Sequence, residues 1–404
     1  MDVKRVLELH ELAVESAGDY PVARPILATL QSREGRHFTG ILGPRGVGKT
    51  VLLKQCAARQ SGSVYVSLDT LPDEADLFDL VLRLHKDYGV GHFYLDEVHF
   101  RSDIESALKA LYDALAVRIW FTSSVALALH ESAYDLSRRV RMQWLYPFSF
   151  REYLHFRHGI QLDTLSMQAV FDRAWSSAHM RAGIYFDEYL QGGLMPFALE
   201  EPEPLPLLKA TVETVIRRDI PRVARLHTDE LDTLDKLLAF IGRSPVDGVN
   251  YSSLSKNLGI TKYKSEQYLA LLEKAFIVQR VFPKGTNVLK EPKVLLAPPY
   301  RLLYRNYEDA VGGLREDYFA EAMRYRGVSF SYLKTMRGRK TPDFAVEIPS
   351  STADDALARV VIEIGGKGKG IVQFKDYQAD RRFVFSHSDA CDGLRRPLFM
   401  LGMA

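Results

Sequence analysis

Cysteine is scarce in this chain, with two among 404 residues, and long apolar runs are missing. Cys56 and Cys391 lie far apart in the sequence, which excludes a disulfide framework and a C-x-x-C metal pair and fits a reducing cytoplasm. No stretch approaches the roughly 18 uninterrupted apolar residues of a membrane-spanning helix. The charged first residues are not followed by an apolar segment, so no signal peptide is visible. The length is sufficient for two or three domains, and we expect a cytoplasmic protein with no membrane partner.

Net charge is also small, at +2, but its distribution is uneven. Residues 251–340 contain 17 Lys and Arg against 8 Asp and Glu, a local balance of +9. Such an asymmetry favours a polyanionic partner, and DNA is the one we expect. A solvated face rich in arginine is the alternative.

The clearest motif is the stretch at residues 40–50, which reads GILGPRGVGKT. It fits the phosphate-binding pattern G-x-x-x-x-G-K-[ST], and it lies between an apolar run and a helix-forming segment. Glycines allow successive backbone N–H groups to turn toward a phosphate, the lysine can reach the terminal phosphates, and the threonine hydroxyl can ligate magnesium. The sequence therefore predicts ATP and Mg²⁺ as ligands, with the nucleotide held by Gly43, Pro44, Arg45, Gly46, Val47, Gly48, Lys49, Thr50 and Val51.

A second motif is the apolar stretch 93–99, which carries two adjacent acids. A buried strand rarely ends on two carboxylates unless a cation or solvent receives them, although chance surface acids are the alternative. We expect Asp96 to hold the metal together with Thr50, and Glu97 to polarise the attacking water. The alternation of strand-like and helical segments through about residue 145 predicts a mainly parallel sheet with helices on both faces.

Several stretches together resemble a known family. GPRGVGKT, YLDEVH, FTSS, DLSRRV and YPFSFREYL, followed later by YLQGGLMPF and VIEIGGKGKG, are similar to prokaryotic AAA+ ATPases that carry a conserved C-terminal domain of unknown function. The resemblance implies that Lys49 and Glu97 act in hydrolysis and that Ser123 is a sensor of the terminal phosphate. It also implies that Arg139 acts on the ATP of a neighbouring subunit, with the adjacent Arg138 as the alternative. A homo-oligomeric ring, hexameric or heptameric, is expected on the same grounds.

The resemblance and the sequence pattern together suggest four domains. An AAA+ ATPase core is expected over 1–150, a helical lid and linker over 151–240, a winged helix-turn-helix over 241–300 and an α/β nuclease-like domain over 301–404. A sensor-2 arginine is not clear, and Arg217 and Arg218 are weak candidates. The alternating prolines of residues 200–206 predict a stiff, extended spacer.

The predicted winged helix consists of a short helix closed by Gly259, a second helix capped by Thr261, and a strand-like segment. Lys262 and Lys264 begin the second helix, where side chains that read a DNA groove usually lie. Winged helices also serve as protein-interaction modules, which is the alternative here.

The C-terminal part resembles the PD-(D/E)XK nuclease fold, in which two acids and a lysine bind a metal and activate water. Asp343 and Glu363 fit the two acids. Gly365 stands where that fold has its lysine, so Lys367 or Lys369 could substitute only if the glycine-rich strand end curls back. We therefore expect this domain to be inactive as a nuclease and to hold DNA.

Two further details of this region stay open. The acid upstream of the pair would be Glu316 or Glu321. Tyr325 and Tyr332 would suit stacking and phosphate contact, and they would suit an ordinary core nearly as well.

The function expected from all of this is that of a Mg²⁺-dependent ATPase motor on double-stranded or branched DNA. Two alternatives remain: an ATP-driven assembly switch in defence or signalling, and an ATP-gated nuclease.

Overall fold

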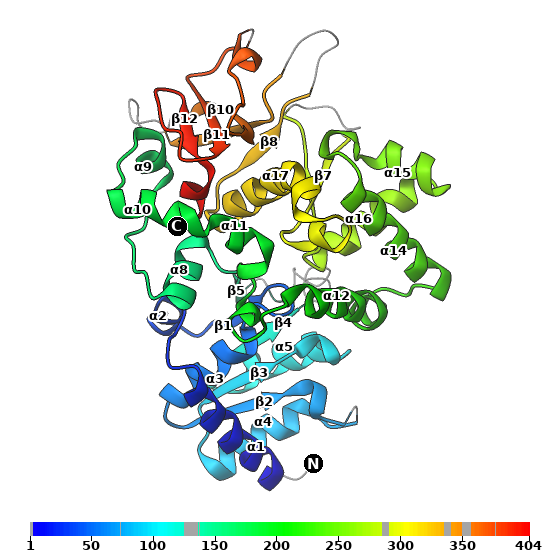
Figure 1. Ribbon diagram of the computed structural model, residues 1–404. Coiled ribbons are helices and arrows are strands. Elements are labelled where there is room, and N and C mark those ends of the chain that lie inside the picture. The colour runs from blue at the N-terminus through cyan, green and yellow to red at the C-terminus, as the bar shows by residue number, and fades with distance from the viewer. Residues whose placement is uncertain are drawn as a thin grey trace. The chain divides into compact units, whose positions relative to one another are not determined.

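The computed structural model describes residues 3–404 except 73, 125–135, 137, 285–290, 335–340, 350–356 and 376 (Figure 1). The chain forms two compact units. The first contains Met1–Tyr146 and Glu213–Leu226, and the second contains Pro147–Val212 and His227–Ala404. The predicted division into four domains stays a prediction, but the expected lid and linker region contributes to both units.

The first unit is built on a five-stranded sheet with the strand order β2-β3-β4-β1-β5. Every neighbouring pair is parallel, which confirms the predicted parallel sheet. All five residues of β1, which lies between β4 and β5, are buried, as expected for a parallel sheet that is covered on both faces. The strands are β1 (Phe38–Leu42), β2 (Ser63–Ser67), β3 (His92–Asp96), β4 (Arg118–Ser123) and β5 (Val140–Trp144).

The helices of the first unit follow from apolar residues at helical spacing. In α4 (Leu77–Tyr88), four buried residues share one face, namely Leu77, Leu80, Val81 and Leu84. The side chain of Asp76 caps this helix by accepting from the N–H of Asp79 at 3.1 Å, and Gly89 ends it with φ of 70°. The other helices are α1 (Val3–Ser16), α2 (Ile26–Gln31), α3 (Lys49–Arg59), α5 (Ile104–Ala114) and α13 (Ile220–Val223).

The second unit begins with short helices, and one of them corrects a sequence prediction. Helix α12 (Pro204–Thr214) starts inside the proline-rich stretch, so the expectation of an extended spacer over 200–206 is wrong from Pro204 onward. Proline is tolerated there because the N–H groups of the first helical turn need no partner within the helix. The preceding helices are α8 (Phe150–His158), α9 (Met167–Asp172), α10 (Ser177–Arg181) and α11 (Phe186–Glu188).

Three helices and a strand pair follow in the second unit. The hydroxyl of Thr261 accepts from the N–H of Lys264 at 3.1 Å, and Gly259 closes the preceding helix with φ of 66°, as the sequence predicted. The strands β6 and β7 pair antiparallel. This is the order of elements that a winged helix requires, and that identity stays a prediction. The elements are α14 (Thr228–Arg243), α15 (Tyr251–Leu258), α16 (Lys262–Lys274), β6 (Val278–Val281) and β7 (Lys293–Leu296).

The C-terminal part of the second unit is a helix and a mixed sheet with the order β12-β11-β10-β9-β8. Strands β8, β9 and β10 form an antiparallel meander, whereas β10–β11 and β11–β12 are parallel. Phe319 of the helix stacks on Phe344 with ring centroids 4.7 Å apart. The elements are α17 (Tyr307–Tyr325), β8 (Phe330–Tyr332), β9 (Phe344–Pro349), β10 (Leu357–Gly366), β11 (Arg381–His387) and β12 (Arg395–Pro397).

Two absences expected from the sequence can be compared with the structure. Cys56, which is buried, and Cys391, which is exposed, are both free. None of the helices in the described part of the chain combines the length and apolar character needed to cross a membrane.

A fully buried ion pair joins the helical part of the second unit to α17. The guanidinium of Arg301 contacts both carboxylate oxygens of Asp317, with Nε to Oδ2 at 2.6 Å and Nη2 to Oδ1 at 2.9 Å. Arg301 also donates to the carbonyl of Ile241 at 3.3 Å, and Asp317 accepts from the N–H of Leu296 at 3.0 Å. Their exposed fractions are 1% and 0%, so neither charge has water as an alternative partner.

Replacing Asp317 by alanine should lower the free energy of unfolding by about 3–5 kcal/mol, because it leaves the Arg301 guanidinium buried without a counterion. Chemical denaturation followed by circular dichroism measures this change. Lys284→Ala is the control, since its ion pair with Glu347 is half exposed and should contribute about 1 kcal/mol or less. Equal losses for the two variants would contradict the role given to the buried pair.

Candidate functional site

The loop between β1 and α3 has the backbone geometry that its glycines predict. Gly46 and Gly48 have φ of 81° and 85°, in the left-handed region that side chains with a Cβ rarely adopt. Gly43 is required for a different reason: a Cβ there would lie 2.1 Å from the carbonyl oxygen of Leu145. The sequence motif therefore reflects both the turn and the close approach of the chain that follows β5.

Lys49 is the first residue of α3, and its side chain turns back into the loop. Its ammonium donates to the carbonyl oxygens of Gly43 and Pro44, both at 2.9 Å, and the residue is only 4% exposed. Burial lowers the pKa of Lys49, and the nearby carboxylates of Glu97 and Asp96 act in the opposite direction. The structure thus brings the lysine and both predicted acids into one electrostatic environment.

A residue that no sequence motif selects supports the loop from outside. Nη1 of Arg24 donates to the carbonyl of Val47 at 3.2 Å and to that of Tyr146 at 2.8 Å. Arg24 is 8% exposed. No motif spacing relates this arginine to the loop, so only the folded chain reveals it.

Asp96 lies at the carboxyl end of β3 with both oxygens engaged. Oδ2 accepts from the hydroxyl of Tyr65 at 2.8 Å, and Oδ1 accepts from the hydroxyl of Thr122. Burial raises the pKa of Tyr65, and the adjacent Asp96 carboxylate raises it further. These contacts hold the Asp96 carboxylate in one orientation at the end of the strand.

Glu97 adopts a backbone conformation that is uncommon for a residue with a side chain, with φ of 52° and ψ of 48°. Its N–H donates to Oγ1 of Thr122 at 3.0 Å and to Oδ1 of Asp96 at 3.2 Å. Its Oε2 lies 3.2 Å from Nδ1 of the buried His99. The strained turn directs the two adjacent carboxylates to different partners, as expected where strain is retained at a functional site.

The hydroxyl that contacts the acid pair belongs to Thr122, one residue before the predicted sensor. Ser124 also faces this region, with its Oγ 3.3 Å from Nε2 of His99. Ser123 lies between them, is fully buried, and accepts from the N–H of Gly43 through its backbone carbonyl at 3.4 Å. The alternation of a strand could have suggested Thr122 and Ser124 as a pair. The sensor role of Ser123 stays a prediction.

The predicted arginine finger is engaged within its own unit. Arg139 binds Asp113 through two contacts, Nε to Oδ1 at 3.0 Å and Nη2 to Oδ2 at 2.9 Å. Arg138 is exposed. Arg217 and Arg218, the weak sensor-2 candidates, are exposed as well, and the guanidinium of Arg218 lies 4.8 Å from the ring centroid of Phe100.

The residues of this unit fit a nucleotide and a magnesium ion. The first turn of α3 supplies backbone N–H groups at Thr50 and Val51, and Lys49 supplies a buried ammonium. Thr50 and Asp96 are the residues that would hold Mg²⁺, which neutralises the charge that develops on the phosphates. The loop carbonyls now bound by Lys49 compete with phosphate oxygens for the same ammonium.

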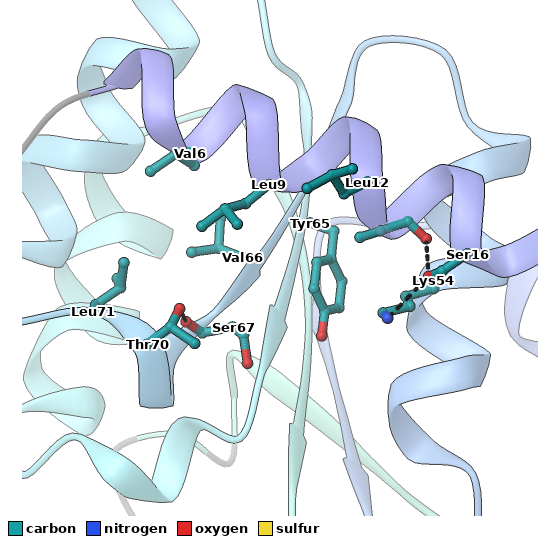
Figure 2. A pocket seen from close by; sticks show the side chains of 11 residues that line it. Val6, Leu9, Leu12, Ser16, Lys54, Tyr65, Val66, Ser67, Thr70 and Leu71 are labelled. Atoms are coloured by element: carbon teal, nitrogen blue, oxygen red, sulfur yellow. Dashed lines mark hydrogen bonds between the residues drawn. The ribbon is translucent and has the colours of Figure 1, made fainter.

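A pocket of about 310 Å³ is lined in part by Tyr65, the residue whose hydroxyl bonds to Asp96 (Figure 2). Its walls come from α1 and β2 and are mostly apolar, and Lys54 donates to the hydroxyl of Ser16 at 3.0 Å at one end. An apolar lining does not suit a phosphate, so we assign the nucleotide to the loop.

In the second unit, Lys369 lies beside Glu363, although the predicted nuclease motif has a glycine, Gly365, at its lysine position. Lys369 Nζ lies 2.6 Å from Oε1 of Glu363, and its N–H bonds to the carbonyl of Gly366 at 3.0 Å, so the strand end does curl back. A Cβ at Gly365 would lie 2.5 Å from Cγ of Lys369. Lys369 therefore occupies the space where a side chain at position 365 would begin. Lys367 is exposed.

The structure also distinguishes the two candidates for the upstream acid. Glu316 lies near Asp343, and Lys293 Nζ contacts its Oε2 at 2.5 Å. Glu321 instead accepts from Nε2 of Gln279 at 2.6 Å. Burial raises the pKa of Glu316 and of Asp343. Among the described residues, no group of three or more His, Cys, Asp and Glu is arranged to hold a metal.

The two lysines predicted to read a DNA groove are both in ion pairs. Lys262 contacts Glu291 and Lys264 contacts Glu230. Both lysines are about half exposed, so these pairs are weak and exchangeable.

The two tyrosines predicted for stacking have hydroxyl partners within the second unit. The hydroxyl of Tyr325 donates to Glu152 at 3.1 Å, and that of Tyr332 donates to the carbonyl of Glu291 at 2.8 Å. These contacts favour the alternative of an ordinary structural role. The basic run at 337–340 lies outside the described residues.

Two family models match parts of the chain. Residues 35–154 match a family described as an AAA domain, and residues 184–297 match one described as a domain of unknown function (DUF8612). The second match ends before the predicted nuclease-like domain begins. The AAA-domain match, the five-stranded parallel sheet and the phosphate loop together support a P-loop core of an AAA+-type ATPase that binds nucleotide.

Comparisons with whole proteins give weaker similarities. An uncharacterized protein of Methanocaldococcus jannaschii is 27% identical over 384 residues, covering 86% of this chain and 79% of that protein. The structure of the Aeropyrum pernix ORC1 protein in complex with DNA has a TM-score of 0.29 at 15% identity, covering 77% of this chain and 93% of that one. The Saccharomyces cerevisiae Hsp104–ADP complex has a TM-score of 0.27 at 16% identity, covering 66% and 39%. TM-scores this low do not indicate a shared fold over the whole chain.

Replacing Gly43 by alanine should weaken nucleotide binding by about tenfold or more, because the new Cβ would displace the loop from the carbonyl of Leu145. Titration with a fluorescent ATP analogue measures the Kd. Gly18→Ala is the matched control, since nothing lies within 4 Å of the Cβ position there and its affinity should stay that of the wild type. An unchanged Kd for Gly43→Ala would contradict the constraint.

Proposed function

We propose that this chain is a Mg²⁺-dependent ATPase that assembles into a ring and acts as a motor on double-stranded or branched DNA. The observation that carries the ATPase proposal is the placement of Glu97 and Asp96 in the electrostatic environment of the buried Lys49, at the carboxyl edge of a parallel sheet. Ligands bind at this edge in open α/β sheets.

The chain's own residues can be given separate roles in hydrolysis. The loop N–H groups and Lys49 would hold the phosphates in place. Glu97 would orient a water and accept its proton, and its strained backbone keeps the carboxylate apart from that of Asp96. Asp96 would support the metal, while the hydroxyl of Thr122 contacts the Asp96 carboxylate and the backbone N–H of Glu97.

The ring proposal depends on an arginine that reaches the nucleotide of a neighbouring subunit. Arg139 has a bidentate partner in Asp113, and that pair would have to open for Arg139 to act in trans. Arg138 is exposed and would need no such opening. The choice between the two therefore depends on whether assembly supplies enough energy to break the pair with Asp113.

The DNA proposal is supported by the local charge of +9 over residues 251–340. The half-exposed lysines at the start of α16 could exchange Glu230 and Glu291 for phosphates. We expect such binding to be non-specific and to weaken steeply as the salt concentration rises.

An ATP-gated nuclease is the second candidate, and the position of Lys369 beside Glu363 favours it. The ion pair of Lys293 with Glu316 argues against it, because it neutralises an acid that a metal would need. A nuclease would cut DNA with Mg²⁺ or Mn²⁺ and lose cutting on Asp343→Ala. An assembly switch would hydrolyse ATP slowly whatever DNA is added.

Glu97→Gln should bind ATP normally and hydrolyse it about 10²-fold or more slowly, because the amide cannot accept the proton of the attacking water. With ATP and Mg²⁺ it should elute as a ring in size-exclusion chromatography with light scattering, most completely with duplex DNA present. Lys49→Ala, which lacks the phosphate-binding ammonium, is the control that should stay unassembled. A Glu97→Gln protein that remains a monomer under all these conditions would contradict the proposed ring-forming motor.

Alanine at the true finger position should slow ATP hydrolysis by roughly 10³-fold or more while leaving the Kd for ATP unchanged. We expect one of Arg138→Ala and Arg139→Ala to show this loss in steady-state turnover. A loss seen in only one of the two arginine variants identifies the finger, and Asp113→Ala, which removes the carboxylate that Arg139 contacts, is the control that should retain turnover. Full activity in both arginine variants would contradict a finger at either position.

A further inference from the structure

Asp219 is a buried carboxylate that no phosphate-loop motif accounts for. It ends the π-helical turn Val215–Asp219, within the segment Glu213–Leu226 that belongs to the first unit. Its side chain is completely buried, and Arg45 of the phosphate loop binds it through two contacts, Nε to Oδ2 at 2.5 Å and Nη2 to Oδ1 at 2.8 Å. Asp219 thus holds Arg45 in place although the two residues are 174 positions apart in the sequence; we call this contact the clamp.

The same carboxylate faces the acid pair through a histidine. Nε2 of His99 lies 3.9 Å from Oδ1 of Asp219, and Nδ1 of the same ring lies 3.2 Å from Oε2 of Glu97. His99 is 3% exposed. Burial acts to raise the pKa of Asp219, but the nearby His99 and the two hydrogen bonds from Arg45 outweigh it and hold this pKa below its ordinary value. Asp219 is therefore charged, and its two partners lead to the loop and to the predicted general base.

We propose that Asp219 is a positioning residue of the nucleotide site, which holds the phosphate loop through Arg45 and orients Glu97 through His99. This inference rests on the ATPase function proposed above. Asp219 touches neither nucleotide nor water in this scheme; it fixes the distance between the group that binds phosphate and the group that activates water. A displacement of about 1 Å between such groups can cost 10²-fold in rate.

The segment that carries Asp219 makes a further contact with the turn that contains His99. Glu213–Leu226 is joined at both ends to residues of the second unit, Val212 and His227. Inside the first unit, Arg222 lies over the ring of Phe100 at 4.3 Å, and Phe100 ends the 3-10 turn Val98–Phe100 that also contains His99. The segment that carries Asp219 therefore packs beside the turn that carries His99 within the first unit.

The test compares full-length Asp219→Asn with the wild type in steady-state ATP hydrolysis and in titration with a fluorescent ATP analogue. The asparagine keeps the shape and removes the charge that both partners need. We expect kcat to fall on the order of 10- to 100-fold, with the Kd for nucleotide within about threefold of the wild type. A purely structural role would lower affinity and stability together and would not separate kcat from binding. Asp79→Asn, which alters an exposed pair with Arg83, is the control and should retain the wild-type rate.

Two further variants keep the outcome decisive. Arg45→Lys retains the positive charge but cannot contact both oxygens at once, so it should lower kcat in the same direction even if Asp219→Asn proves unstable. In a His99→Gln background, Asp219→Asn should lower kcat by less than it does alone, since part of its effect passes through His99.

Wild-type kcat in both Asp219→Asn and Arg45→Lys would overturn the clamp while leaving the ATPase proposal intact. Fully multiplicative effects of Asp219→Asn and His99→Gln would overturn the path through the histidine. A wild-type chain that does not hydrolyse ATP would overturn the proposed function, and the role of Asp219 would fall with it.

Discussion

The first unit depends on one electrostatic constraint: the buried ammonium of Lys49 must be matched by oxygen atoms. In this structure two loop carbonyls provide the direct contacts, and the carboxylates of Asp96 and Glu97 provide the balancing charge. A buried cation without such partners would lose its proton or destabilise the fold. The position of the loop, the end of β3 and the turn at Glu97 all follow from placing these charges at one edge of the sheet. A phosphate suits the same position because it brings further oxygen atoms and negative charge to the same ammonium.

Features that depend on residues close together in the sequence could be predicted, whereas contacts between residues far apart in the sequence could not. The phosphate loop, the parallel sheet and the acid pair are written in short stretches whose residue types and spacing have few other physical explanations, and the structure places Lys49, Asp96 and Glu97 together. Thr122 could have been found from the period of a strand, but a family pattern pointed to its neighbour Ser123. Helix α12 was missed because prolines were read as breakers, although a first helical turn tolerates them. Arg24 and Asp219 could not have been found, since each meets the loop only after the chain has folded back over tens or hundreds of residues.

The C-terminal sheet shows how a residue distant in sequence can take the place of one that a predicted motif lacks. The glycine at position 365 departs from the nuclease pattern, yet the absence of a Cβ is what allows Lys369 to pack over it and reach Glu363. From the sequence we could infer that the strand end must curl back for a lysine to substitute, but not whether it does. That depends on the turn from Gly366 to Lys369, whose backbone hydrogen bond no residue pattern specifies.

The two acid clusters of the chain differ in how their charge is balanced, and this difference bears on their chemistry. Around Asp96, the direct partners are neutral hydroxyls of Tyr65 and Thr122, so the negative charge stays available to a cation. In the C-terminal sheet, Lys293 and Lys369 contact Glu316 and Glu363 directly. A divalent metal would have to displace two ammonium groups there, one of them on the buried Lys293. The same kinds of side chain thus contact neutral hydroxyls at Asp96 and lysines in the C-terminal sheet, which favours the first unit as the place of the proposed Mg²⁺ site.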